Sequence, residues 1–449
     1  MKKGNTASEI RLSDHFTYGR LLRFTLPSII MMVFTSVYGV VDGYFASNFV
    51  GKTPFAAVNF IMPFLMMLGC VGFMFGTGGS ALVSRLMGMQ DMERANRTFS
   101  LLVYVSTGVG IIIALLGILL LRPVAAALGA QGQLLEDCVT YGRIILIALP
   151  VYILQMEFPS FFITAEKPQL GLWVTVASGV TNMVLDALLV GVFPLGLAGA
   201  ALATALSQAV GGLIPLFYFS RPNTSLLRLG KTAFDGPALL KTCTNGSSEL
   251  MSNISMSLVG MLYNIQLLKY AGENGVAAYG TMMYVNFVFL SAFIGYSIGT
   301  APVIGFHYGA QNHPELKGLL RKSTVIISAV SACMLAAALA LAQPLSKIFV
   351  GYDDQLLELT VNGFRIFAFS FLLAGFAIFS SGFFTALNDG LTSAIISFLR
   401  TLVFQVAAVL LLPLLWGIDG IWWSVVAAEA MAVAVGAVFL ICKQKKYHY

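Results

Sequence analysis

The stretch LLVYVSTGVGIIIALLGILLL, residues 101–121, contains no charged side chain and is long enough to cross a bilayer as one helix, which takes about 20 residues. The whole chain has the same character: 58% of its 449 residues are hydrophobic, only 10% are charged, and its mean hydropathy is +0.84. Soluble domains average roughly 45–50% apolar and about 25% charged residues. The composition therefore predicts a protein that is folded in a membrane.

Twelve stretches of this kind run along the chain, six in each half. They are expected at residues 24–46, 56–84, 98–121, 139–163, 169–192, 196–220, 245–270, 275–305, 322–349, 357–384, 391–415 and 418–442. What remains is too short for a soluble domain. The predicted fold class is an all-α polytopic membrane protein with twelve transmembrane helices.

Lysine and arginine gather in the loops on one side of this arrangement. If the N-terminus is cytosolic, most of the 26 Lys and Arg residues fall on the inner side, where short loops usually carry them. Residues 1–23 are polar and basic and lack the apolar core of a signal peptide. We therefore expect a multi-pass protein of the plasma (cytoplasmic) membrane with both termini in the cytosol. The net charge of +6 indicates this orientation and an affinity for anionic lipid, and does not indicate nucleic-acid binding.

The two halves of the chain resemble each other at a constant offset of 221 residues. This offset places Gly88 on Gly309 and the Thr-Ala pair at 164–165 on the Thr-Ala pair at 385–386. Because each half holds an even number of spans, the repeat is parallel, as in transporters that carry substrate between two halves. The expected organisation is a cytosolic segment 1–23, an N-lobe 24–220, a cytosolic inter-lobe linker 221–241, a C-lobe 242–442 and a cytosolic tail 443–449.

The sequence offers no catalytic or nucleotide-binding signature. Its five cysteines are scattered singly, its four histidines lie in loops or tails, and no nucleophile–base pair or metal spacing emerges. Gly230-Lys231-Thr232 resembles the end of a phosphate-binding loop, but Ser225 stands where the first glycine of that motif belongs. We therefore expect no enzyme activity and no cofactor, so uphill transport would have to use an ion gradient.

Five acidic residues lie inside the expected spans, where a charged side chain costs about 2.5–3.5 kcal/mol on insertion scales. They are Asp42, Glu157, Asp186, Glu249 and Glu429. Asn182 lies one helical turn before Asp186 and projects from the same face, and the next span offers the Thr204 hydroxyl. A carboxylate, an amide oxygen and a hydroxyl would ligate Na⁺, or would hold a proton that desolvation keeps on the acid. The sequence leaves both ions open.

The other acids allow more than one interpretation. Glu249 lies near the expected cytosolic end of its span, where it either reaches the interface or faces a cavity. Glu429 is mid-span among alanines, and Glu157, between two prolines, could line a central cavity. Pro27 precedes Asp42 on the same helix and could bend it. Adaptable side chains that could wall a permissive substrate cavity are Met31, Met62, Met156 and Met256.

Several ordered motifs point to a known family. They are Val41-Asp42 with FVG at 49–51, GMQD at 88–91, TAEKP at 164–168, NMVLD at 182–186, GAALAT at 199–204 with Ser207-Gln208, and TAL at 385–387 leading to Arg400. Together they resemble the multidrug and toxic compound extrusion (MATE) family of cation-coupled efflux transporters, over essentially the whole chain. One mild departure is Ala187, where a proline often follows the aspartate.

The resemblance implies a two-lobe, twelve-helix fold of the MOP superfamily. It implies a secondary antiporter that exports amphipathic, mostly cationic drugs while Na⁺ or H⁺ enters, by alternating access. The cation site that it implies consists of Asp42, Asn182, Asp186, Thr204, the carbonyl of Ala200 and, in the adjoining network, Tyr38. It also implies that the first helix bends at Pro27 when the site is protonated.

The resemblance does not decide whether the C-lobe has its own cation site or which substrate is carried. Some members use C-lobe carboxylates, and here Glu429 and Glu249 are the candidates for such a site. An alternative function is a lipid-linked precursor flippase of the same superfamily, which would need an arginine-rich cavity, whereas only Arg400 lies well within a span. An intramembrane enzyme is a remote alternative. The expected partners are organic cationic or amphipathic drugs and membrane lipids, and we expect a monomer.

Overall fold

The computed structural model describes residues 9–449, which form helices joined by short connections. Three π-helical turns continue or interrupt the α-helices. In chain order the elements are α1 (Tyr18–Phe45), η1 (Ala46–Val50), α2 (Lys52–Gly88), α3 (Met92–Ala127), α4 (Gln133–Ile147), α5 (Leu149–Thr164), α6 (Pro168–Asp186), η2 (Ala187–Val192), α7 (Gly196–Ser220), α8 (Gly236–Gly309), α9 (His313–Val350), α10 (Asp354–Phe367), α11 (Phe369–Ala386), α12 (Gly390–Phe398), η3 (Leu399–Val403), α13 (Phe404–Trp416) and α14 (Ile418–Tyr447).

These elements make twelve spans. Ten helices, counted over residues 9–449, are long and apolar enough to cross a membrane, and α4 with α5 forms an eleventh span that is bent by 55°. Helix α8 has 74 residues, which at 1.5 Å per residue would extend about 110 Å, far more than the roughly 30 Å hydrocarbon core. It is broken at Gly272, whose φ of 66° lies in the left-handed region, so α8 supplies two spans.

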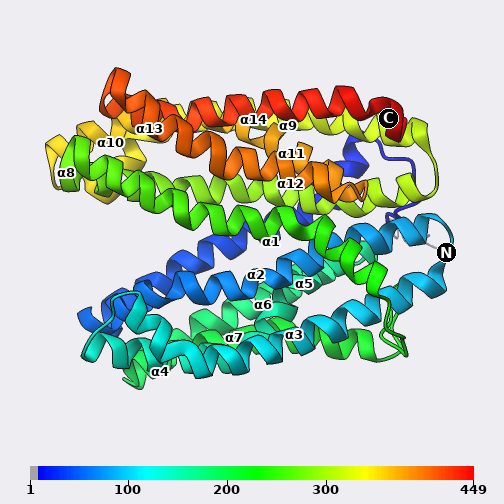
Figure 1. Ribbon diagram of the computed structural model, residues 1–449, viewed down its shortest axis with the longest axis horizontal. Coiled ribbons are helices and arrows are strands. Elements are labelled where there is room, and N and C mark those ends of the chain that lie inside the picture. The colour runs from blue at the N-terminus through cyan, green and yellow to red at the C-terminus, as the bar shows by residue number, and fades with distance from the viewer. Residues whose placement is uncertain (1–8) are drawn as a thin grey trace, which may run out of the picture.

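The spans divide into two lobes (Figure 1). Helices α1 to α7 form the lower lobe in this view and α8 to α14 the upper one, which are the N-lobe and C-lobe expected from the repeat. The start of α1, the C-terminus and the inter-lobe linker lie at one end of the molecule, here called the terminal end. The lobes converge at the terminal end and diverge toward the end that carries α4 and the kink of α8.

The hydrophobic cores explain this shape. One core cluster joins both lobes, with Phe99 and Phe161 from the N-lobe and Phe293 and Phe383 from the C-lobe. Two further clusters each belong to a single lobe, one within residues 57–201 and the other within residues 259–422. Within residues 9–449, one buried cluster therefore joins the lobes, and each lobe also buries a core of its own.

Glycines allow the two lobes to touch backbone to backbone at the terminal end. A Cβ on Gly88, the last residue of α2, would collide with the carbonyl of Phe306 on α8, and a Cβ on Gly309, the last residue of α8, would collide with the carbonyl of Arg85 on α2. Gly88 and Gly309 are related by the 221-residue offset. The repeat therefore places one glycine from each lobe at the same crossing.

The linker is shorter than expected and is fastened to α3. Its extended part ends at Asp235, because Asp235 accepts a hydrogen bond from the Ala238 N–H as the cap of α8. The linker runs along α3: the Arg228 N–H donates to Asn96 Oδ1 (2.8 Å), and the Thr232 hydroxyl donates to the Arg97 carbonyl (2.9 Å).

The ends of the chain also differ from expectation. Helix α1 begins at Tyr18 rather than 24, since the Thr17 side chain caps it, and α14 continues to Tyr447 instead of leaving a tail from 443. Polar residues therefore extend both helices beyond their apolar spans.

Candidate functional site

The N-lobe brings the predicted acids together. Asp42 is on α1, and Asp186 is the last residue of α6. Their carboxyl groups lie within hydrogen-bonding reach of each other, and Asn182 Nδ2 donates to Asp42 Oδ1 at 3.4 Å. Ionised carboxylates only accept hydrogen bonds, so a bond between two carboxyl groups requires a proton on one of them.

The backbone around these acids is unusual. The π-helical turn η2 begins directly after Asp186, and η1 begins four residues after Asp42. Such turns inside α-helices occur frequently at functional sites. Helices α1 and α6 approach closely because Gly179 leaves room for the rings of Phe34 and Tyr38, which a Cβ there would meet. Tyr38 thus lies one turn from Asp42, against the helix that carries Asp186.

The site is nearly dry and contains unpaired oxygens. Asn182 is 2% exposed and Asp186 is 1% exposed, whereas Asp42 is partly buried. Within residues 9–449, Asn182 Oδ1 and Asp186 Oδ2 are buried without a hydrogen-bond partner. Buried polar atoms normally have partners, so each exception needs an explanation such as a bound ion, proton or water.

Thr204 and Ala200 lie on the neighbouring helix α7. The Thr204 hydroxyl lies within hydrogen-bonding reach of Tyr141 of α4, and the carboxyl groups of Asp42 and Asp186 lie near the same tyrosine. Ala200 is buried beside Gly199, which packs against the Leu189 carbonyl of η2. Tyr141 is therefore a member of the site that sequence reasoning missed, because no motif marks it.

A polar chain continues from the site on α5, α6 and α7. Ser178, one turn before Asn182, accepts from Gln155 Nε2 (2.8 Å) and donates to the Ser207 carbonyl (2.7 Å). The Oε1 atom of Gln208 is buried with no partner among the residues that the structure describes. This chain was also missed, although the spacing of Ser178 from Asn182 was a usable signal.

Glu249 lies at the seam between the lobes. It is on α8, and its charge acts on Cys70 of α2 in the N-lobe and is acted on by Arg400 in the C-lobe. No hydrogen bond or ion pair reaches its carboxylate from any residue in the range 9–449, and the residue is only partly buried. Of the acids that sequence reasoning left open, Glu249 is therefore the one placed between the two lobes.

Glu157 and Glu429 are engaged within their own lobes. Glu157 is fully buried in the N-lobe, where it accepts from the Ser106 hydroxyl of α3 at 2.5 Å. Glu429 on α14 forms a two-pronged ion pair with Arg400 of η3, with both nitrogen–oxygen distances at 2.9 Å. Both carboxylate oxygens of Glu429 are thus paired with the Arg400 guanidinium.

The remaining candidates are more dispersed. Pro27 is buried within an unbroken α1, next to the point where α1 packs on Gly295 of α8. Met31 is buried, Met62 accepts from the Tyr141 hydroxyl at 3.6 Å, Met156 lies against Gly72, and Met256 is about half exposed. Over residues 9–449, no group of three or more His, Cys, Asp or Glu is placed to hold a metal ion.

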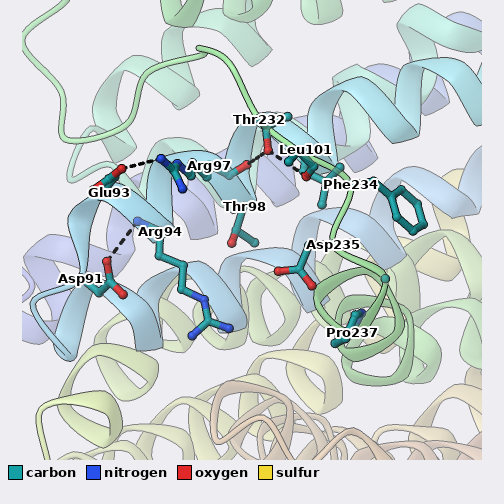
Figure 2. Close-up of a pocket in the computed structure, with 12 residues that line it drawn as sticks. Asp91, Glu93, Arg94, Arg97, Thr98, Leu101, Thr232, Phe234, Asp235 and Pro237 are labelled. Carbon is teal, nitrogen blue, oxygen red and sulfur yellow. Dashed lines mark hydrogen bonds and ion pairs between the residues drawn. The ribbon is translucent and has the colours of Figure 1, made fainter.

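A separate cavity opens at the terminal end (Figure 2). It has a volume of about 550 Å³ and lies between the first turns of α3 and the linker, with Arg94, Arg97 and Asp235 among the residues that line it. Its acids are already engaged, since Glu93 pairs with Arg97 and Asp235 caps α8. This cavity contains none of the acids at membrane depth.

Comparison with protein families identifies the family to which this two-lobe chain belongs. The MatE family model matches the chain twice, over residues 27–188 and over residues 250–411. The chain belongs to the MATE family. One match falls in each lobe, so the repeat and the two-lobe fold predicted from the sequence are confirmed, and the protein is a transporter, not an enzyme.

Relatives and solved structures of MATE proteins match along almost the full length. The multidrug export protein MepA of Staphylococcus haemolyticus is 27% identical, covering 94% of this chain and 92% of its own, and MepA of Staphylococcus aureus is 24% identical with the same coverage. A MATE crystal structure in complex with MaL6 superposes with a TM-score of 0.92 at 22% identity, covering 99% of this chain and all of the other. A MATE transporter in an outward-facing conformation also gives 0.92, at 21% identity and 99% coverage of both chains.

Proposed function

We propose that this MATE protein is a secondary antiporter that exports amphipathic organic cations in exchange for an inward-moving coupling cation. The observation that carries the proposal is the contact between the carboxyl groups of Asp42 and Asp186 in a nearly dry part of the N-lobe. Support for drug export comes from the relatives, which are named multidrug export proteins.

The proposal takes H⁺ as the ion held in this conformation. A single proton between Asp42 and Asp186 accounts for the contact of two groups that repel each other when both are ionised. Na⁺ would instead have to separate the carboxyl groups and draw Thr204 away from Tyr141. The unpaired oxygens of Asn182 and Asp186 would then become its ligands.

Proton release would change the charge of α1 where it meets α6. With both acids ionised, Asp42 and Asp186 would repel each other, and α1 would be pushed away from the helix against which Phe34 and Tyr38 pack. Pro27, which lacks a backbone donor, is the point where α1 bends most readily. Protonation and the shape of α1 would thus be coupled.

The seam supplies a place for the exported cation. Glu249 is a carboxylate without a partner among the described residues, and it lies between α2 and η3. Met256, two helical turns further along α8, lies on the same face and is about half exposed. A negative charge beside an adaptable apolar side chain suits an amphipathic cation.

The orientation is part of the proposal. Because most Lys and Arg lie in loops at the terminal end, we place this end in the cytosol, with the protein in the plasma membrane as a monomer. The shared core at the terminal end would then close the cytosolic side in the present conformation.

A lipid-linked precursor flippase receives less support from the C-lobe. Such a protein needs unpaired positive charge in its cavity to hold a pyrophosphate. Arg400, which lies within a span, already gives two of its nitrogens to Glu429. Its charge is therefore largely neutralised before any ligand arrives.

Efflux from proteoliposomes tests the proposal. Purified protein is reconstituted with the fluorescent cation ethidium inside, and efflux is followed with a pH gradient alone and then with a Na⁺ gradient alone. We expect efflux with the pH gradient. Efflux with only the Na⁺ gradient would assign Na⁺ as the coupling ion, and no efflux with either gradient would refute drug–cation exchange.

Site variants make the test specific. Asp42→Asn and Asp186→Asn should each abolish gradient-driven efflux without lowering the amount of folded protein. Asp137→Asn is the matched control, because Asp137 is an acid of the same lobe whose carboxylate accepts from Gln133, one turn earlier on the same helix, in an exposed contact. Equal loss in the control variant would show that the effect is not specific to the site.

A further inference from the structure

The chain just before α1 is fastened to the N-lobe. The Leu12 N–H donates to Glu166 Oε1 at 2.7 Å, and Lys167 Nζ lies 2.8 Å from Glu9 Oε1. Glu166 and Lys167 form the connection between α5 and α6, the helix that carries Asp186. Residues 9–12 are therefore tied to a loop of the N-lobe.

The next residues are fastened to the C-lobe. Glu315 in the first turn of α9 accepts from the Phe16 N–H at 2.9 Å and from His15 Nδ1 at 2.6 Å. Lys322, two turns further along α9, donates to the Phe16 carbonyl. One carboxylate and one ammonium of α9 thus hold residues 15–16 by both backbone and side chain.

Apolar side chains reinforce these polar contacts. Leu12 and Phe16 are completely buried, and both belong to the core cluster that joins the lobes. The Phe16 ring meets the His307 ring of α8 edge to face, with centroids 6.4 Å apart. Leu12 and Phe16, which precede the first span, are therefore buried between the two lobes.

We propose that residues 9–16 form an inter-lobe clasp that stabilises the closed terminal end and must release one lobe before that end can open. The polar contacts are 2.6–2.9 Å long, so separation of the lobes by a few ångströms would break all contacts on one side. Phe16 of the clasp meets His307, two residues before Gly309 at the glycine crossing of α2 and α8, so the clasp reinforces the same closed state. It acts on the conformational equilibrium and makes no contact with substrate.

Alkylation of a buried cysteine measures this equilibrium without any substrate. Ser84 on α2 is fully buried against Gly305 of α8, in the closed seam. The probe is Ser84→Cys in the full chain with the five native cysteines replaced, purified in nanodiscs and treated with a soluble maleimide. Its reaction rate reports how often the terminal end opens. Because this measurement needs neither a transported substrate nor a coupling ion, a negative result would count against the clasp and not against the proposed function.

Glu166→Ala frees the clasp from the N-lobe and Glu315→Ala frees it from the C-lobe. Each should raise the alkylation rate about tenfold, since a hydrogen bond to a charged group contributes about 1.5–3 kcal/mol and 1.4 kcal/mol is a factor of ten. Because a clasp works only while both ends are held, the double variant should react no more than about twofold faster than the faster single variant.

Glu93→Ala is the matched control. Glu93 is also an acid in the first turn of a helix at the terminal end, but its partner Arg97 lies on the same helix. The Glu93→Ala variant should be alkylated at the same rate as the parent protein. Unchanged rates in the two clasp variants, a rise in only one of them, or a double variant equal to the product of the single effects would each overturn the clasp.

A milder variant covers the case in which Glu315→Ala does not fold. Glu315→Gln retains an acceptor for the Phe16 N–H and removes the charge that faces His15 and Lys322, so a rise of a few fold is expected. No rise in Glu315→Gln would also overturn the proposal.

Discussion

The two lobes use equivalent positions for different chemistry. At the 221-residue offset, Asp42 corresponds to Tyr263 and Gly179 corresponds to Arg400. In the N-lobe, acids meet each other and leave buried oxygens unpaired. In the C-lobe, the Tyr263 hydroxyl donates to Gln405 at 2.7 Å, and Arg400 neutralises Glu429. Near these positions, the N-lobe holds buried oxygens without a partner among residues 9–449, whereas the C-lobe pairs its acid with its own arginine.

The difference shows how a repeat can divide its functions. A carboxyl group whose partner is a proton or an ion can change its charge during a cycle, whereas a carboxylate held by an arginine of the same chain keeps it. Charge changes during transport would then be confined to the N-lobe. The C-lobe would supply a fixed wall and the central Glu249.

The largest expected effect comes from comparing positions 42 and 263. Asp42→Asn should reduce gradient-driven efflux to the level of empty liposomes, because the amide cannot exchange a proton. Tyr263→Phe removes only one hydroxyl and should leave efflux within about twofold, since a neutral hydrogen bond contributes about 1 kcal/mol. Ethidium efflux from proteoliposomes measures both. Equal losses in the two variants would mean that the lobes share the ion-handling task.

The next effect concerns stability. Glu429→Gln leaves Arg400 charged and unpaired inside a span, which should cost about 3–5 kcal/mol and lower the melting temperature in detergent. The double variant Arg400→Met with Glu429→Met removes both charges and should regain most of that loss. If Glu429→Gln melts like the parent, the ion pair contributes nothing to holding η3 against α14.

A smaller effect is expected at the position equivalent to Arg400. Gly179→Ala places a methyl group against Phe34 and Tyr38, and such overpacking typically costs about 1–3 kcal/mol. Because it pushes α1 from α6, efflux should fall together with the melting temperature. Gly108→Ala is the control, since nothing lies within 4 Å of a Cβ there. An unchanged Gly179→Ala variant would show that α1 and α6 need not approach this closely.

The smallest effect concerns the loops that hold the chain ends. The N-lobe loop before α6 holds residues 9–12, and the equivalent C-lobe loop before α12 holds the end of α14 through Asp389, which accepts from Lys443 (2.8 Å) and Tyr447 (2.7 Å). Burial alone would raise the pKa of Asp389, but these hydrogen bonds outweigh it and lower the pKa to about 2.

The sign of the pH dependence follows from that lowered pKa. A depressed pKa contributes stability that is fully present above the unfolded value of about 3.9 and is lost only as the pH falls through about 2. Asp389→Asn should therefore lower stability by about 1–2 kcal/mol, equally at pH 5 and pH 8. Thermal melting at the two pH values checks this, and a loss that shrinks markedly at pH 5 would contradict it.

Local patterns in the sequence predicted most of the fold. Apolar runs located the spans, and the offset of Gly88 and Gly309 predicted the two lobes, because both features are readable from neighbouring residues or from one constant shift. Asn182 and Asp186 were recognisable for the same reason, since they share a helix face. The start of α8 was placed too late, although the Asp235-Gly236-Pro237 signal of a capped helix was present.

Contacts between distant segments could not be predicted in this way. The Arg400–Glu429 pair joins two spans that are 29 residues apart, and Leu12 bonds to Glu166 across 154 residues. Tyr141 reaches Thr204 only because α4 and α7 pack together. Such partners depend on the rotation of each helix about its own axis, which hydrophobic periodicity fixes only coarsely.

The attachment of the linker to α3 sets a limit on how far the lobes can travel. With Thr232 fixed to the Arg97 carbonyl, only residues 233–235 are free before α8 begins at Gly236. Four residue steps reach at most about 14 Å when fully extended. The linker is therefore a short tether, and any opening at this point must be a rotation about a nearby axis, because the chain is too short for the lobes to drift apart.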